Sequence, residues 1–104
     1  MSAVRQREIA GGVNLTRDPW NGRNFEYLGE DPLLAGRLVG EQIAGIQQHA
    51  VASTIKHYVL NPQESGRFVY DARISEAAHR ESDLLAFEIG IKVGNPASAM
   101  CAYN

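Results

Sequence analysis

Short apolar stretches alternate with longer amphipathic ones along the chain, and this alternation predicts three strands separated by two helices. Residues 9–15 form a brief apolar stretch with charged residues before it and a turn-rich segment after it, which is typical of a strand. Residues 51–55 are rich in β-branched side chains, and residues 97–102 are small and apolar. We expect both of these segments to be strands as well.

Two capping signals mark where the helices are expected to begin. Asp31 stands directly before a proline. An aspartate at this position can accept hydrogen bonds from the free amide groups of the first turn, and a proline is favoured as the first helical residue. The pair therefore predicts a helix start. Leucine and isoleucine then recur near helical spacing, so we expect a helix over residues 32–47. Ser75 is placed in the same way before a second helix, expected over residues 76–93 and ended by the Gly-Asn-Pro of residues 94–96.

The order strand, helix, strand, helix, strand is the pattern of parallel βαβ units. We therefore expect an α/β fold with parallel strands, and right-handed crossovers that place both helices on one face of the sheet. In such folds the loops after the strands carry the chemistry. The segment after residue 15, the pair Lys56-His57, the long polar loop of residues 58–73 and Tyr103 all lie in such positions.

Composition and charge exclude several classes of function. The 104 residues are enough for one domain, with 44% apolar and 21% charged side chains, which is ordinary globular composition. The net charge of −2 and the scattered basic residues do not favour nucleic acid as a partner. No apolar run has the roughly 18 residues that span a bilayer, so a membrane is not expected. The spread histidines and the single cysteine predict no metal site, and we expect no cofactor.

Charged and aromatic side chains in the expected loops are the candidates for ligand binding. Arg23 offers a fork of donors that suits adjacent hydroxyl groups, with Glu26 near enough in sequence to hold it, although spacing alone favours a surface arginine that caps a turn. Lys56 and His57 together offer an ammonium and an imidazole at a strand end. As an isolated dipeptide, this pair is weakly specific.

Two further candidates have structural alternatives of their own. Arg67 can bind a ligand, or it can form an ion pair with Glu64 inside the loop, worth about 0 to 1 kcal/mol if exposed. Tyr103 can present its hydroxyl group to a ligand, or its ring can pack at the end of the sheet. The residue types alone favour the ion pair for Arg67 and the packing role for Tyr103.

An ordered set of motifs gives these residues a shared context. They are Gly12-Val-Asn-Leu-Thr-Arg-Asp-Pro19, Asn21-Gly-Arg-Asn-Phe-Glu-Tyr-Leu-Gly-Glu-Asp-Pro32, Thr54-Ile-Lys-His-Tyr58, Asn61-Pro-Gln-Glu64 followed by Arg67, Glu76 to Phe87, and Met100-Cys-Ala-Tyr-Asn104. In this order they resemble the landmarks of the glycoside hydrolase family 3 β-glucosidases, from about residue 11 to the end. Two positions depart from the family pattern: Trp20 replaces a usual arginine, and Pro62 interrupts the Asn-x-Gln-Glu motif.

The resemblance implies a fold, a reaction and a set of binding residues. It implies a (β/α)8-type barrel, of which this chain is a β-α-β-α-β slice, and retaining hydrolysis of β-linked glucosides or glucose-like sugars. The residues that match the family's binding groups for the terminal sugar are Arg23, Lys56, His57, Arg67 and Tyr103. The resemblance also implies a cis peptide bond between Lys56 and His57.

The same resemblance implies that no residue of this chain is catalytic. The family's nucleophilic aspartate and its acid/base glutamate match no position here, so we expect an incomplete catalytic-domain fragment, inactive in isolation, over residues 1–104. Exposed strand edges and helix faces then predict a homo-oligomer that completes the barrel, including by exchange of a strand or helix between copies. The alternative is a non-catalytic, self-associating α/β module that binds no sugar.

Overall fold

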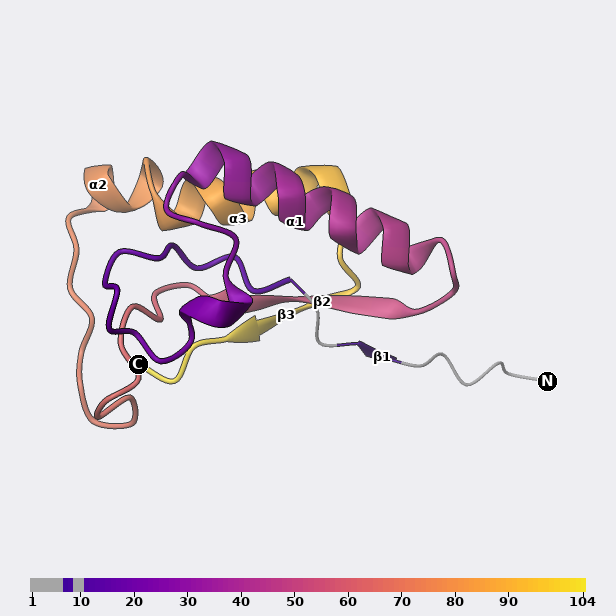
Figure 1. Ribbon diagram of the computed structural model, residues 1–104. Coiled ribbons are helices and arrows are strands. Elements are labelled where there is room, and N and C mark those ends of the chain that lie inside the picture. Colours follow the sequence, from indigo (N-terminus) through magenta and orange to yellow (C-terminus); the bar gives the residue numbers. More distant parts are fainter. Residues whose placement is uncertain (1–6, 9–10) are drawn as a thin grey trace.

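The computed structural model describes residues 7–8 and 11–104, and it shows an α/β fold with parallel strands (Figure 1). The elements in chain order are β1 (Arg7–Glu8), the 3-10 helix η1 (Asn24–Glu26), α1 (Pro32–Gln47), β2 (Ala52–Tyr58), α2 (Glu76–Arg80), α3 (Asp83–Gly94) and β3 (Ser98–Cys101). The strand order is β1-β2-β3, and both pairings are parallel. The expected α/β class and the parallel strands are confirmed.

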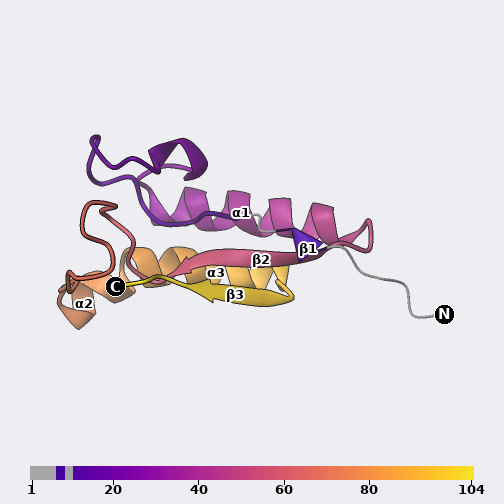
Figure 2. The same cartoon turned by 90° about the horizontal axis from the view of Figure 1, so that it is seen from below.

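One face of the sheet is covered by the two long helices. Figure 1 shows α1 and α3 side by side above the strands, and Figure 2 gives the same arrangement from below. The apolar core lies between these layers, where Val39 and Ile43 of α1, Ile55 of β2 and Phe87 of α3 are almost completely buried. This is the arrangement expected when consecutive βα units use right-handed crossovers.

Glycines allow α1 and α3 to approach closely. A Cβ atom added at Gly36 would lie 2.8 Å from the carbonyl oxygen of Ala86, and one added at Gly40 would lie 2.6 Å from the Cβ of Val93. Both distances are shorter than real side-chain contacts, so a larger residue would force the helices apart and leave space in a close-packed core.

Both predicted helix starts are confirmed. Asp31 Oδ1 accepts hydrogen bonds from the backbone nitrogens of Leu33 at 2.8 Å and Leu34 at 3.2 Å. Ser75 Oγ accepts a hydrogen bond from the backbone nitrogen of Ala78 at 3.3 Å. These side chains satisfy amide groups that have no partner within the first turn of a helix.

The second helix is not continuous, and this corrects the expectation for residues 76–93. It divides into α2 and α3, and Ser82 between them has backbone angles that are neither helical nor extended, with φ −125° and ψ −103°. Asp83 then directs its buried carboxylate away from the helix, where it pairs with Arg17 and accepts a hydrogen bond from the backbone nitrogen of Leu15 at 3.4 Å. The break therefore ties the loop after residue 15 to the helix layer.

Two strand boundaries also differ from the sequence-based expectation. Residues 9–10 of the first expected strand lie outside the described residues, and in residues 11–15 only Gly12 forms a bridge, to Lys56. The second strand extends to Tyr58 and not to residue 55. Lys56 and His57 consequently lie inside β2. Lys56 pairs with Met100 of β3, whereas the register shift between Lys56 and Tyr58 leaves His57 outside the ladder.

No helix in the described part of the chain combines the length and the apolar character needed to cross a lipid bilayer.

Candidate functional site

Three segments from distant parts of the sequence gather at the C-terminal end of the sheet. Figures 1 and 2 show the loop that precedes α1, the loop that follows β2 and the C-terminus at the same end of the molecule. Each of these segments carries predicted site residues, and β2 delivers Lys56 and His57 between them. The topology thus brings the candidates to one rim, and the side-chain contacts show how they are connected.

Glu26 joins two of the predicted cations. Its Oε2 atom lies 2.6 Å from Lys56 Nζ, and its other carboxylate oxygen pairs with Nε of Arg23. Burial works against ionisation of this carboxyl group, but the hydrogen bond and charge of Lys56, together with Arg23, outweigh burial and hold the pKa of Glu26 below its usual value of 4.5. Glu26 therefore stays ionised and fixes the position of both cations.

Glu64 makes a second bridge on the other side of Arg23. Its Oε2 atom lies 2.8 Å from Nη1 of Arg67, and its Oε1 atom lies 3.9 Å from Nη1 of Arg23. The intraloop pair of Glu64 and Arg67 that the sequence offered as an alternative is present, yet it belongs to a larger row of alternating charges. That row runs Lys56, Glu26, Arg23, Glu64, Arg67.

His57 is held by its backbone and buried within the protein. Asn14 Oδ1 accepts a hydrogen bond from the His57 nitrogen at 2.8 Å, and Asn14 Nδ2 donates to the carbonyl oxygens of His57 at 3.0 Å and Val59 at 2.7 Å. The Lys56-His57 peptide bond is cis, as the resemblance implied, and the Tyr58-Val59 bond is cis as well.

The electrostatic surroundings keep the His57 ring neutral at pH 7. Burial, followed by the positive charges of Arg23 and Lys56, lowers the pKa of His57 to about 4. A neutral imidazole has one nitrogen that donates and one that accepts, so His57 offers a single directed donor instead of a third positive charge beside Arg23 and Lys56.

Tyr103 reaches the same cluster through Arg67. The guanidinium carbon of Arg67 lies 5.2 Å from the centre of the Tyr103 ring and 4.9 Å from that of Phe68. The two rings are themselves 4.9 Å apart, and the Tyr103 side chain remains 58% exposed. The Tyr103 ring therefore packs against Arg67 and Phe68, as the packing interpretation expects, and its role toward a ligand stays a prediction.

Three polar connectors in this cluster were not predicted as site residues. Asn14, Tyr27 and Asn61 are all less than a tenth exposed, and each bonds to a group more than thirty positions away in sequence. All of them lie within the quoted motifs, but a motif does not reveal which distant partner a polar side chain meets. Pro62, which interrupts one motif, does not prevent Asn61 and Glu64 from approaching within 3.0 Å.

The arrangement suits a neutral ligand with many hydroxyl groups. The row of three cations and two carboxylates has a formal charge of +1, and its guanidinium and ammonium groups are donors held in place by carboxylates. Hydrogen bonds from charged donors contribute roughly 1.5 to 3 kcal/mol each. Among residues 7–8 and 11–104, no group of three His, Cys, Asp or Glu side chains is placed to hold a metal ion.

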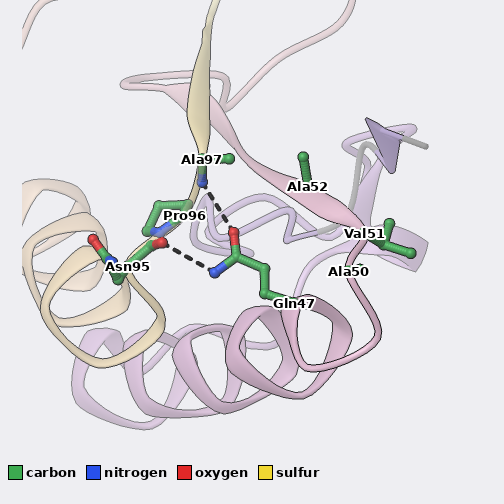
Figure 3. Close-up of a pocket in the computed structure, with 7 residues that line it drawn as sticks. All are labelled: Gln47, Ala50, Val51, Ala52, Asn95, Pro96 and Ala97. Carbon is green, nitrogen blue, oxygen red and sulfur yellow. Dashed lines mark hydrogen bonds between the residues drawn. The ribbon is translucent and has the colours of Figure 1, made fainter. Parts of the chain in front are cut away.

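The opposite end of the sheet has a different character. A hollow of about 350 Å³ lies there. It is lined by Gln47 at the end of α1, by residues 50–52 at the start of β2 and by residues 95–97 between α3 and β3 (Figure 3). Gln47 donates hydrogen bonds to the carbonyl oxygens of Gly94 at 3.1 Å and Asn95 at 3.0 Å, and its own Oε1 accepts from the Ala97 nitrogen at 3.1 Å. Within residues 7–8 and 11–104, no charged side chain lines this hollow.

Comparison with known proteins finds one matching family and several similar β-glucosidases. The model of the glycosyl hydrolase family 3 N-terminal domain matches residues 7–104. Beta-glucosidase B of Emericella nidulans is 50% identical over 96 residues, and Beta-glucosidase BoGH3A of Bacteroides ovatus is 48% identical over 96 residues. The structure of beta-glucosidase 3B from Thermotoga neapolitana in complex with glucose superposes with a TM-score of 0.93 at 44% identity.

These matches cover nearly all of this chain but a small part of each relative. The alignments include 92% of the chain and 11% or 13% of the two curated relatives, and 95% of the chain and 14% of the Thermotoga protein. The family match over residues 7–104 nevertheless includes the whole charged cluster. The chain belongs to glycosyl hydrolase family 3, and it corresponds to part of that family's N-terminal domain.

Proposed function

We propose that this chain forms part of the wall that binds the terminal sugar in a retaining β-glucosidase. The observation that carries the proposal is the single connected cluster formed by the five predicted residues, which reach one another through Glu26, Glu64, Tyr27 and Asn61. The relative from Thermotoga neapolitana was solved in complex with glucose, which supports a sugar as the ligand.

In this proposal the chain contributes binding and not the covalent step. Retaining hydrolysis needs a carboxylate nucleophile and an acid/base residue. Glu26 and Glu64 are instead engaged by cations, which suits them to hold the binding groups in position. Donors that strengthen their hydrogen bonds as the sugar ring distorts stabilise the transition state, so the wall assists catalysis only when the two catalytic carboxylates are supplied by other residues.

A calorimetric titration with glucose tests the proposal. Lys56→Met removes a charged donor from the cluster, and Lys92→Met is the matched control, because Lys92 pairs with Glu88 on the exposed side of α3. We expect millimolar binding by the original chain and the control, and affinity lower by about 10-fold or more in Lys56→Met. Equal affinities in all three proteins, or no binding at all, would contradict a sugar-binding role.

A kinetic assay tests whether the chain alone lacks hydrolytic activity. The purified chain is expected to show no turnover of an aryl β-glucoside, because none of its residues is assigned a catalytic role. Sustained hydrolysis that follows the chain through purification, and that is absent from a mock preparation, would overturn this part of the proposal.

We further propose that the chain associates with other βα units to complete a barrel, and that two copies do so when no other units are present. Leu33, Leu34 and Leu38 on α1 are 58%, 55% and 46% exposed, which is a large apolar surface for one helix. Such a surface is stabilised when a neighbouring element covers it. This association is also what the alternative function, a self-associating module without sugar binding, would need.

Light scattering with the matched variants Leu38→Lys and Arg37→Lys tests the association. We expect a dimer or larger species at micromolar concentration, reduced by Leu38→Lys and unchanged by Arg37→Lys. A stable monomer in the original chain would contradict self-association without affecting the sugar-binding proposal.

A further inference from the structure

Asn61 lies where two branches of the charged cluster meet. It is 5% exposed, and its Nδ2 atom is 2.9 Å from the hydroxyl oxygen of Tyr27 and 3.0 Å from Oε1 of Glu64. Glu64 pairs with the two arginines, whereas Tyr27 leads to the histidine. A single amide group therefore contacts both the row of ion pairs and the uncharged pair of Tyr27 and His57.

The orientation of this amide follows from the chemistry of its neighbours. An ionised carboxylate can only accept hydrogen bonds, so the atom of Asn61 that faces Glu64 must be the nitrogen and not the oxygen. The two hydrogens of that nitrogen are then shared between Glu64 and Tyr27. Tyr27 consequently accepts a hydrogen bond from Asn61.

One direction of the next hydrogen bond uses every donor along this series of contacts. Because the Tyr27 oxygen accepts from Asn61, its own hydrogen is available for His57 Nδ1, which lies 3.3 Å away. Burial raises the pKa of Tyr27 to about 12, so this hydroxyl group keeps its proton at neutral pH. A neutral histidine that accepts at Nδ1 carries its hydrogen on Nε2. Within residues 11–104, no hydrogen bond occupies that Nε2 atom.

We propose that Asn61 and Tyr27 are positioning residues that hold His57 as the Nε2-protonated tautomer, so that it presents a fixed hydrogen-bond donor to a hydroxyl group of the sugar. The part that concerns the sugar rests on the proposed function, whereas the tautomer is a property of the free protein. Asn61 also orients Glu64, which couples the direction of the histidine donor to the position of Arg67. A ligand hydroxyl group that meets this site must act as an acceptor toward His57.

Nitrogen NMR of the free protein tests the tautomer, because the two ring nitrogens of a neutral histidine have different chemical shifts. We expect His57 to show a protonated Nε2 and an unprotonated Nδ1 at pH 7. In Tyr27→Phe we expect a measurable population of the Nδ1-protonated form, because the fixed donor is lost. Tyr70→Phe is the matched control, since the Tyr70 hydroxyl group donates to the Gln63 carbonyl oxygen outside this network.

Two results would overturn the proposal. One is a protonated Nδ1 in the original chain, and the other is an identical tautomer in Tyr27→Phe and Tyr70→Phe when circular dichroism shows both to be folded. If Tyr27→Phe does not fold, Asn61→Asp gives a second test, because a carboxylate can only accept and therefore competes with His57 for the Tyr27 hydroxyl hydrogen. An unchanged His57 tautomer in folded Asn61→Asp would also contradict the proposal.

A glucose titration of the same proteins separates this inference from the proposed function. We expect Tyr27→Phe to bind glucose about 3-fold to 10-fold more weakly than Tyr70→Phe, which corresponds to the loss of one well-directed hydrogen bond. Equal affinity of the two variants would contradict the positioning role even if the tautomer is as expected. A correct tautomer with no glucose binding in the original chain would instead contradict the proposed function alone.

Discussion

The two ends of the same small sheet differ in how their polar groups are satisfied. At the C-terminal end, Arg23 and Lys56 are held by carboxylates that are themselves partly buried. At the opposite end, Gln47 satisfies backbone groups of α3 and β3 with a neutral amide. The first arrangement holds charged donors in fixed positions, whereas the second joins the end of α1 to the segment between α3 and β3.

This difference shows that function and stability can be assigned to different ends of one scaffold. Ionised groups at a partly buried site are costly to desolvate, and their mutual pairing does not by itself make a protein more stable. Neutral hydrogen bonds at a helix end each contribute roughly 0.5 to 1.5 kcal/mol. We therefore expect substitutions at the charged end to change ligand binding most, and substitutions at the opposite end to change stability most.

The largest expected effect follows from Arg23→Ala, because Arg23 contacts both bridging carboxylates. Its loss removes a charged donor and leaves Glu26 and Glu64 with one cation each, so we expect glucose affinity to fall by about 10-fold to 150-fold. Calorimetric titration measures this change. Arg73→Ala is the control, since Arg73 pairs with Asp71 at an exposed position, and comparable losses in both variants would contradict the comparison.

Acid should destabilise the charged end through His57. The folded pKa of this residue is about 4, below the ordinary value of 6.5, so the unfolded chain binds a proton between these values while the folded chain does not. The contribution to stability is complete above pH 6.5 and is lost as the pH falls toward 4. The expected decrease in the free energy of unfolding is on the order of 2 kcal/mol.

Urea unfolding at a series of pH values measures this dependence. Arg23 and Lys56 oppose protonation of the ring, whereas Glu26 and Glu64 favour it. The lowered pKa of Glu26 affects stability only below about 4.5, so the range from pH 6.5 to 5 isolates the histidine. The decrease should disappear in His57→Gln and persist in His49→Gln, and its persistence in both would contradict the assignment.

The smallest of these effects is expected at the opposite end. Gln47→Ala removes an amide that bonds to Gly94, Asn95 and Ala97, and we expect the free energy of unfolding to fall by about 1 to 2 kcal/mol with glucose affinity unchanged. Gln48→Ala, at the exposed neighbouring position, should change neither property. A glucose affinity that falls in Gln47→Ala would show that the two ends are not independent.

The elements that local chemistry determines could be predicted from the sequence. Asp31 and Ser75 signal helix starts through side-chain caps, and both act as expected. The break before Asp83 was not predicted, and the partner of Asp83 at that break is Arg17, more than sixty positions earlier in the sequence. The extension of β2 to Tyr58 likewise depends on pairing with β3, which reaches Cys101 through a shift of register.

In the candidate site, too, contacts between residues close in sequence were predictable and contacts between distant residues were not. Arg23, with its neighbour in sequence Glu26, was predictable because residues three positions apart meet in a short helical turn. The roles of Tyr27 and Asn61 were not predictable, since their contacts join segments thirty or more residues apart. A motif identifies such residues as a group, but only the fold shows which of them connect the others.

The most direct test of the central claim is a glucose titration of the isotopically labelled chain, followed by its backbone amide shifts. Binding at the charged end predicts saturable changes at Arg23, Lys56, His57, Arg67 and Tyr103, with Gln47 and its partners at the opposite end unaffected. Changes that centre on the Gln47 hollow, or no changes at saturating millimolar glucose, would contradict the account.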